Sequence, residues 1–263
     1  MDFFDLKGKV SVITGATGAL GNSISEALAG AGSDILIVTR DETRGNKLSG
    51  ELKNRYGVET RVHTWDALDL DSIKKLAADA KEWKGHVDVL INNAGGAVTT
   101  SSAHFFDRSD EDIRYVLEVN LLSPLYCCRE FGRIMKEQGS GRIINIASIA
   151  GITGRDRRMY QQGGVNEHLI DYAASKGGVI SMSRDLACLL APYGVRVNSI
   201  SPGGFRHGTS QRFAELYSDR TPIGHMGKTE TDLQGAVVFL ASSASDYVIG
   251  HNLVVDGGFT ICK

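Results

Sequence analysis

The chain has 263 residues, with 29 Lys and Arg against 31 Asp and Glu, so its formal net charge is −2. Hydrophobic residues make up 42% and charged residues 23%, which allows a sizeable core and excludes a disordered chain. The near-neutral balance gives no electrostatic basis for binding nucleic acid or an anionic membrane surface. No apolar run approaches the ~18 residues needed to span a bilayer.

The N-terminal residues and the cysteines indicate the compartment in which the protein is found. The first five residues are acidic at two positions and lack the basic start and apolar stretch of a signal peptide. The four cysteines, Cys127, Cys128, Cys188 and Cys262, form neither a CxxC pair nor a metal-ligand spacing. We therefore expect reduced thiols in a cytoplasmic protein without a metal site.

Short apolar, β-branched runs alternate with longer amphipathic stretches along the whole chain. Seven such runs predict strands at residues 10–14, 35–39, 58–65, 87–92, 143–147, 196–200 and 253–256. Between the first two, Ile24, Ala27, Leu28 and Ala31 recur with the spacing of one helix face. This alternation predicts an α/β fold with a parallel sheet covered on both faces, and right-handed crossovers favour a doubly wound sheet.

No linker, repeat or composition shift marks a domain boundary, so we expect residues 1–263 to form one domain. The length fits, because α/β folds often reach about 250 residues as a single domain. Residues 155–169 match neither a helix nor a strand pattern and contain Gly163 and Gly164. We expect a surface loop or short insertion there.

A glycine-rich turn follows the first predicted strand and opens the first predicted helix. It runs Thr14-Gly15-Ala16-Thr17-Gly18-Ala19-Leu20-Gly21. Glycines let the backbone approach a pyrophosphate, whose charge then lies on the free N–H groups of the helix N-terminus. An ordinary tight turn without a ligand would have the same pattern, but the position at the first strand–helix junction favours a dinucleotide site.

The end of the second predicted strand indicates which dinucleotide binds. An acidic residue there accepts from a ribose 2′-hydroxyl, whereas an Arg accommodates a 2′-phosphate. Thr39 stands where an NAD-type Asp is expected, and Arg40 follows it. The sequence therefore predicts NADP(H) as the preferred cofactor, while Asp41 keeps NAD(H) possible.

Tyr172 and Lys176 are four residues apart, so they share one face of a predicted helix. A nearby cation favours phenolate and can bring the phenol pKa, normally about 10, towards the range of a general acid/base. The pattern YxxxK also occurs by chance in many helices, so its weight depends on its surroundings.

With these surroundings, the sequence resembles the short-chain dehydrogenase/reductase family over essentially its whole length. The matching motifs are the glycine turn, Asn92-Asn93-Ala94-Gly95, Asn120, Ser148, Tyr172 with Lys176, Arg196-Val197-Asn198, Pro202-Gly203 and Val255-Asp256-Gly257-Gly258. The resemblance implies a Rossmann-type sheet of seven strands. It also implies an NAD(P)-dependent interconversion of a secondary alcohol and a carbonyl.

The resemblance implies four catalytic roles. Tyr172 exchanges the hydroxyl proton, and Lys176 lowers the pKa of Tyr172 and binds the nicotinamide ribose. Ser148 donates a hydrogen bond to the carbonyl oxygen, where charge develops. Asn120 holds a water that links Lys176 to solvent.

The resemblance also implies the cofactor contacts and the assembly. Asp66, Asn92 and Gly95 are expected along the adenine and ribose, and Pro202 and Gly203 beside the nicotinamide. A homotetramer is expected, formed through the helices around residues 121–135 and 175–190. The full set of expected cofactor-binding residues is Gly15, Thr17, Gly18, Leu20, Arg40, Asp66, Asn92, Ala94, Gly95, Tyr172, Lys176, Pro202 and Gly203.

Two features depart from the family pattern. Ala19 stands where single-domain members usually have Gly, and a residue this small should preserve the phosphate turn. Ser148 and Tyr172 are 24 residues apart, about twice the usual spacing. Tyr160 lies at the usual distance, but Gly164, four residues on, cannot supply a cation. We therefore assign Tyr172 as the base and expect the insertion within residues 155–169.

The insertion is rich in Arg, and Arg206 and His207 follow the sixth predicted strand. We expect Arg155, Arg158, Arg206 and His207 to contact a small polar sugar, sugar acid or polyol, since Arg suits an anionic group. One alternative is a 3-oxoacyl thioester reductase that acts on an acyl carrier protein. Another is a nucleotide-sensing regulatory protein without turnover. The presence of all four expected catalytic residues argues against this alternative.

Overall fold

The computed structural model describes residues 3–96, 102–165 and 169–261, so Cys262 and residues 166–168 of the expected insertion lie outside the described residues. Seven parallel strands form one sheet in the order β3-β2-β1-β4-β5-β6-β7. This arrangement confirms the predicted doubly wound, Rossmann-type fold. The strands are β1 (Val10–Thr14), β2 (Asp34–Thr39), β3 (Thr60–Thr64), β4 (Val89–Asn92), β5 (Gly141–Ile146), β6 (Val195–Pro202) and β7 (Asn252–Val255).

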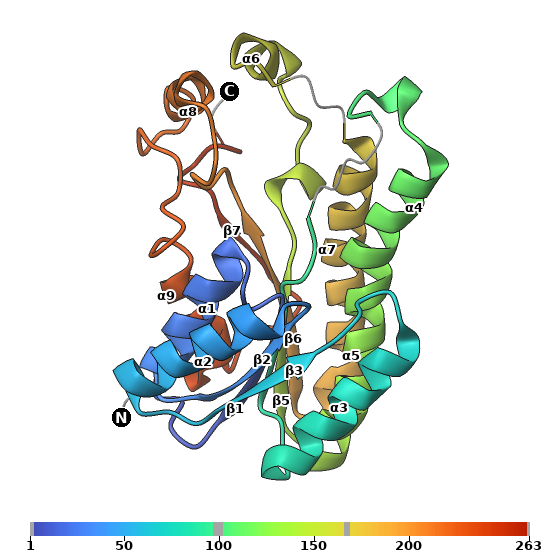
Figure 1. Ribbon diagram of the computed structural model, residues 1–263, viewed down its shortest axis with the longest axis vertical. Helices are drawn as coiled ribbons and strands as arrows, with labels where there is room; N and C mark the ends of the chain where they lie inside the picture. Colours follow the sequence, from blue (N-terminus) through green and yellow to red (C-terminus); the bar gives the residue numbers. More distant parts are fainter. Residues whose placement is uncertain (1–2, 97–101, 166–168, 262–263) are drawn as a thin grey trace.

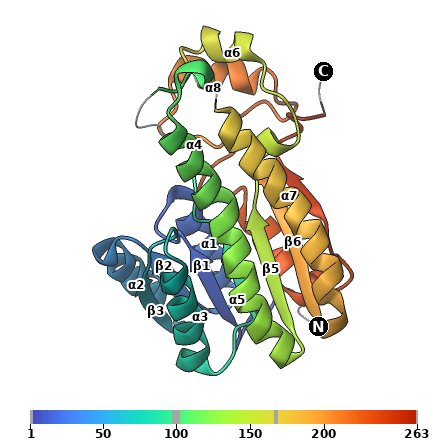
Figure 2. The same cartoon turned by 90° about the vertical axis from the view of Figure 1, so that its right-hand side faces the viewer.

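Helices cover both faces of the sheet (Figure 1). One layer contains α1 (Ala19–Gly30), α2 (Glu42–Tyr56) and α9 (Gln234–Ala241). The other contains α3 (Leu70–Lys84), α5 (Ser123–Gln138) and α7 (Ile170–Leu190), and Figure 2 shows these three helices in front of the sheet. Before α5, α4 (Asp110–Leu117) continues through the π-helical turn η2 (Glu118–Leu122). Every helix in the described ranges is too short or too polar to span a bilayer.

Alternation along the strands divides the core into two clusters. In β1, Val12 packs against the α3, α5 and α7 layer, whereas its neighbour Ile13 packs against the α1, α2 and α9 layer. The same alternation separates Leu90 from Ile91 in β4. Because successive strand side chains point to opposite faces, each apolar run supplies both cores.

The strand order reverses direction between β1 and β4, where the chain passes from one half of the sheet to the other. A crevice forms at such a switch point, outside the carboxyl ends of the strands. The glycine turn, the end of β4 and the end of β5 all reach this edge. Above it lie the short helices α6 (Arg157–Gln162) and α8 (Gln211–Ser218) (Figure 1).

The expectation that residues 155–169 lack regular structure was wrong for part of the segment, because α6 forms there. The Asp156 carboxylate accepts a hydrogen bond from the Arg158 N–H and so begins the helix. Met159 is fully buried against Phe213 of α8, and the ring of Tyr160 lies 5.0 Å from that of Phe213. These tertiary contacts stabilise a six-residue helix that has no apolar periodicity of its own.

Candidate active site

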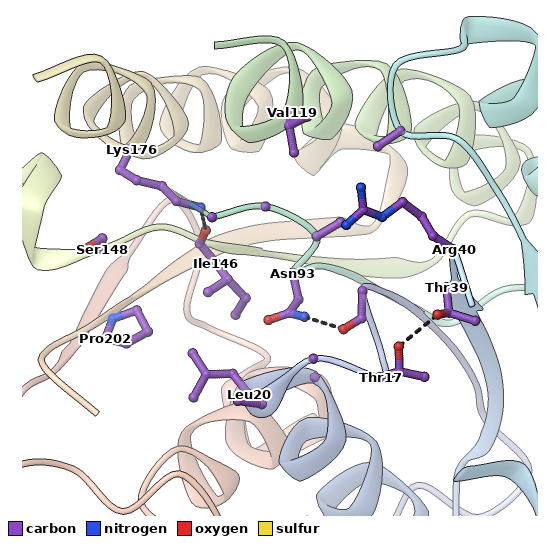
Figure 3. A pocket seen from close by; sticks show the side chains of 18 of the residues that line it. Thr17, Leu20, Thr39, Arg40, Asn93, Val119, Ile146, Ser148, Lys176 and Pro202 are labelled. Carbon is purple, nitrogen blue, oxygen red and sulfur yellow. Dashed lines mark hydrogen bonds between the residues drawn. The ribbon is translucent and has the colours of Figure 1, made fainter. Parts of the chain in front are cut away.

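A cavity of about 1000 Å³ opens at the carboxyl edge of the sheet (Figure 3). At one end lie Arg40 and Asp41, which follow β2, and at the other lie Ser148, Tyr172 and Lys176. The glycine turn forms the floor between them. An elongated cavity with a polar group at each end has the shape that an extended dinucleotide requires.

The glycine turn fits a pyrophosphate. Gly15 has a φ of +64°, which favours glycine, and a side chain at Gly21 would place its Cβ 2.1 Å from the Gly15 carbonyl oxygen. Gly18, the residue before α1, offers no side-chain cap. The first N–H groups of α1 therefore face the cavity without a side-chain partner from Gly18, as anion binding at a helix N-terminus needs. Ala19 begins the helix without disturbing the turn.

The adenosine end of the cavity carries two arginines. Arg40 is exposed and extends into the cavity from the end of β2 (Figure 3). The Arg44 side chain donates a 2.5 Å hydrogen bond to the Thr17 carbonyl oxygen. Asp41 accepts from the Arg44 N–H at 3.0 Å and caps α2. One oxygen of the Asp41 carboxylate is thus engaged in the helix cap, and Arg40 lines the cavity where a 2′-phosphate would lie.

Asn92 is not among the residues that line the cavity, and its expected cofactor contact stays a prediction. Its side chain is buried beneath the sheet, where Nδ2 donates to Asn145 Oδ1 at 2.8 Å and contacts Cys128 Sγ at 3.3 Å. Asn92 ends β4 two residues after Leu90, so both side chains point to the α5 side of the sheet. The next residue, Asn93, faces the cavity instead and donates to the carbonyl oxygens of Thr14 and Gly15.

Asn120 lies behind the cavity wall, in the π-helical turn, and is fully buried. Its Nδ2 donates to the carbonyl oxygens of Gly96 and Val116 at 2.8 and 2.9 Å, and its Oδ1 accepts from the Gly96 N–H at 2.9 Å. Oδ1 would also lie only 2.5 Å from a Cβ at Gly95. Asn120 therefore holds the Gly95–Gly96 segment against α4, and its water-binding role stays a prediction.

Lys176 reaches the cavity from α7 (Figure 3). Its Nζ donates a 2.8 Å hydrogen bond to the carbonyl oxygen of Ile146, at the end of β5. Burial lowers the pKa of Lys176 to about 8, because the charged form loses its hydration. At neutral pH the side chain is a cation, 5.8 Å from the centre of the Tyr172 ring.

The pKa of Tyr172 is raised above its usual value, in contrast to the expected lowering by Lys176. Burial is the largest cause, while a hydrogen bond with Ser148 and the charge of Arg155 act in the opposite direction. The Arg155 guanidinium lies 5.6 Å from the centre of the Tyr172 ring and 5.9 Å from that of Tyr160. The structure thus brings Ser148, Tyr172 and Lys176 together and adds Arg155 beside them.

The other expected substrate residues lie further out. The Arg158 side chain is 84% exposed and pairs with Asp156 at 3.1 Å. Arg206 donates to Gln211 Oε1 at 2.8 Å, and His207 is exposed in the same segment. Neither these three nor Arg155 line the cavity as the structure describes it, and Arg155 lines a smaller pocket of about 270 Å³ beside Gly151 and Ala173. Their contact with a substrate stays a prediction.

Sequence reasoning missed several residues of the cavity wall. Tyr115 and Val119 stand four apart on the helix that contains Asn120, so helical spacing from that motif could have identified them. Trp65 and Phe205 carry no such signal, because only the folded chain brings them to this edge. The cavity residues that the sequence analysis did not assign to the site include Trp65, Ala67, Leu68, Gly96, Tyr115, Val119, Ile146, Ala147 and Phe205.

The sheet, the glycine cradle and the Ser–Tyr–Lys group together define an oxidoreductase that uses a nicotinamide dinucleotide. Among the described residues, no group of three or more His, Cys, Asp or Glu side chains could hold a metal ion.

Comparison with known proteins places this chain in a family. A family model described as enoyl-(acyl carrier protein) reductase matches residues 15–260. The 3-oxoacyl-(acyl-carrier-protein) reductase FabG of Aquifex aeolicus is 33% identical over an alignment of 257 residues that covers 96% of this chain and 98% of that protein. The 2-dehydro-3-deoxy-D-gluconate 5-dehydrogenase of Bacillus subtilis is 36% identical over an alignment of 268 residues that covers 98% of this chain and 97% of that protein.

A solved structure agrees with these relatives. The gluconate 5-dehydrogenase of Burkholderia cenocepacia, solved with NADP and tartrate, matches with a TM-score of 0.89 and 29% identity, covering 100% of this chain and 99% of that one. The chain belongs to the short-chain dehydrogenase/reductase family. It is an NAD(P)-dependent enzyme that interconverts a secondary alcohol and a carbonyl, which confirms the predicted reaction class.

Proposed function

We propose that the enzyme uses NADP(H) to interconvert a hydroxyl and a keto group on a small sugar acid. The observation that carries the proposal is the guanidinium of Arg155, 5.6 Å from the Tyr172 ring centre. No carboxylate of the described part of the chain pairs with Arg155. A cation without an acidic partner beside the proton-transfer group suits a substrate that brings its own anionic group.

The proposed proton transfer follows from the site geometry. Tyr172 exchanges a proton with the substrate oxygen, and Ser148 donates a hydrogen bond to the same oxygen as its charge changes. Burial disfavours the phenolate form of Tyr172, whereas the hydrogen bond with Ser148 and the charge of Arg155 favour it. Lys176 places a second cation 5.8 Å from the centre of the Tyr172 ring. The nicotinamide, when bound, supplies or accepts the hydride.

The cofactor preference rests on the adenosine end of the cavity. Arg40 extends into it, Thr39 is bonded to the Thr17 hydroxyl at 2.8 Å, and Asp41 is committed to capping α2. Arg40 can bind a 2′-phosphate, whereas the first carboxylate after β2, that of Asp41, already accepts through Oδ1 in the cap of α2. The Burkholderia relative solved with NADP supports the same preference.

The relatives support both an acidic and a thioester substrate. The Bacillus relative is named for a gluconate derivative, and the Burkholderia structure contains the dicarboxylate tartrate. The Aquifex relative is named for 3-oxoacyl groups on an acyl carrier protein, which makes a thioester reductase the second candidate. Arg155 favours the sugar acid, because a 3-oxoacyl chain carries no charge near its keto group.

A substrate panel separates these candidates. Gluconate, mannitol and a 3-oxoacyl thioester are offered with NADP(H) and with NAD(H), and turnover is followed at the absorbance of the reduced nicotinamide. We expect turnover of gluconate with NADP to exceed the turnover of mannitol, which is neutral, and of the 3-oxoacyl thioester. Turnover of the thioester alone would replace the proposal with the second candidate, and turnover of none would refute both.

We further propose a cytoplasmic homotetramer. Large apolar side chains are exposed on the outer surfaces of the two expected interface helices and the turns beside them. They are Leu122, Leu125, Leu189 and Tyr193. Cys127, Cys128 and Cys188 are free thiols, which suits a reducing compartment.

A further inference from the structure

We infer that the buried ion pair between Arg108 and Asp171 positions Tyr172 for proton transfer, an inference that rests on the proposed role of Tyr172. Arg108 Nε donates to Asp171 Oδ2 at 2.7 Å, and the two side chains are 0% and 3% exposed. Asp171 directly precedes Tyr172 in the first turn of α7. The pair therefore joins the segment before α4 to the turn that carries the phenol.

The ion pair lies at the start of α7, where the residue before the helix, Leu169, provides no side-chain cap. A carboxylate in the first turn is favourable at the positive end of the helix dipole, and Asp171 is the acidic residue in that turn. The long segment between Ser148 and Tyr172 is also a weaker constraint on the helix than a short connection would be.

Arg108 is itself held in place from its own side. Its Nη1 donates to the Ser102 carbonyl oxygen at 3.2 Å and lies 3.8 Å from Asp112 Oδ2. Asp112 belongs to α4, not to α7. One buried guanidinium thus faces two buried carboxylates, of which only Asp171 lies on the helix that carries the catalytic side chains.

A second contact fixes α7 further along and isolates the role of the pair. A Cβ at Gly151 would lie 2.5 Å from the Gly177 nitrogen and 2.6 Å from the Lys176 carbonyl carbon, so the backbones touch there. This contact holds the turn that carries Lys176. The ion pair holds the preceding turn, so its loss should displace Tyr172 more than Lys176.

The two carboxylates provide a matched test. Asp171→Asn and Asp112→Asn each neutralise a buried carboxylate that faces Arg108. We expect Asp171→Asn to lower kcat about 10- to 100-fold, the cost of a misplacement of roughly 1 Å, with the Kd of NADPH unchanged. Asp112→Asn should leave kcat close to that of the wild type. Equal losses of kcat in both variants, or a kcat unaffected by Asp171→Asn, would overturn the inference.

Two further measurements keep the test decisive. If Asp171→Asn does not fold, Arg108→Lys keeps the charge but loses the planar fork, and an unchanged kcat in this variant would refute the positioning role. Hydrogen exchange of the amides at residues 171–175 needs no substrate. Faster exchange there in Asp171→Asn than in Asp112→Asn supports the inference even if the wild type turns over no member of the panel, and equal exchange contradicts it.

Discussion

The ammonium group of Lys176 and the carbonyl oxygen of Ile146 are joined by a 2.8 Å hydrogen bond. Ile146 is the last residue of β5, and Ser148 follows two residues later. The bond therefore ties the helix that carries the proposed base to the strand that leads into the proposed carbonyl-binding serine. It also keeps a buried cation at a fixed point of the cavity wall.

This buried cation predicts how stability depends on pH. The pKa of Lys176 is about 8 in the folded protein and about 10.4 in an unfolded chain, so between these values the unfolded state binds more protons. The free energy of unfolding therefore rises with pH in this window. Relative to Lys176→Met, the wild type without cofactor should gain about 1–2 kcal/mol between pH 8 and pH 9.5, measured by urea unfolding.

The Lys176→Met variant removes this titration and leaves the others in place, so it serves as the reference at each pH. A constant difference in unfolding free energy between the two proteins from pH 8 to pH 9.5 would show that Lys176 has an ordinary pKa in the folded state.

The assignment of the base predicts opposite results for two tyrosines. Tyr172→Phe should bind NADPH normally but lose about 10²- to 10⁴-fold in kcat, the range of general acid/base catalysis. Tyr160 packs against Phe213 and Arg155, so Tyr160→Phe should retain kcat and change KM at most. Steady-state kinetics at saturating substrate measure both. A loss of turnover in Tyr160→Phe but not in Tyr172→Phe would reverse the assignment.

Cofactor choice is tested at Arg40. Arg40→Ala should weaken NADPH binding by about 1.5–3 kcal/mol, the contribution of a hydrogen bond to a charged group, and leave NADH binding almost unchanged. Fluorescence titration with each cofactor measures the two Kd values. Asp41→Ala provides the control, because loss of the α2 cap should affect both cofactors alike. Equal losses for both cofactors in Arg40→Ala would remove the argument for NADP(H).

The substrate anion is tested with two arginines of one segment. Arg155→Met should raise KM for an acidic substrate much more than for a neutral analogue of the same size. Arg158→Met is the matched control and should have little effect, since Arg158 is exposed and paired with Asp156. Added salt should weakly reproduce the Arg155→Met effect. A loss that is the same for charged and neutral substrates would show that the segment only covers the cavity.

The proposed assembly predicts a mass. Light scattering at micromolar concentration should give four times the mass of the protomer, and Leu189→Glu should reduce it, because a charge would replace an exposed apolar side chain on α7. A wild-type monomer would exclude the tetramer, and an unchanged mass in the variant would move the interface away from this part of α7.

The sheet could be predicted because each strand carries its own signal. Val12 and Ile13, or Leu90 and Ile91, belong to apolar runs that are buried on both faces, and such runs are visible without tertiary information. The helix α6 could not be predicted in this way. It depends on the burial of Met159 against α8, a contact between segments that are far apart in the sequence.

The parts of the candidate site that a sequence motif defines could be predicted. The parts that only tertiary packing brings to the site could not. The glycine turn and the Tyr172–Lys176 spacing identified the cradle at one side of the cavity and the proton-transfer group at its end. The direction of the Asn92 side chain could have been predicted, because alternation within β4 turns it beneath the sheet. The raised pKa of Tyr172 could not be foreseen, since burial depends on the whole fold.

The helices α6 and α8 share a small core that is separate from the two cores of the sheet. Its buried members are Met159, Phe213, Ala214, Tyr217 and Met226. A Cβ at Gly163 would lie 2.7 Å from the Phe213 ring, so the fit is close. An attempt to change substrate specificity by exchanging segments with a relative must therefore transfer both helices as one unit. A graft of α6 alone would leave mismatched surfaces above the cavity while the sheet beneath stayed intact.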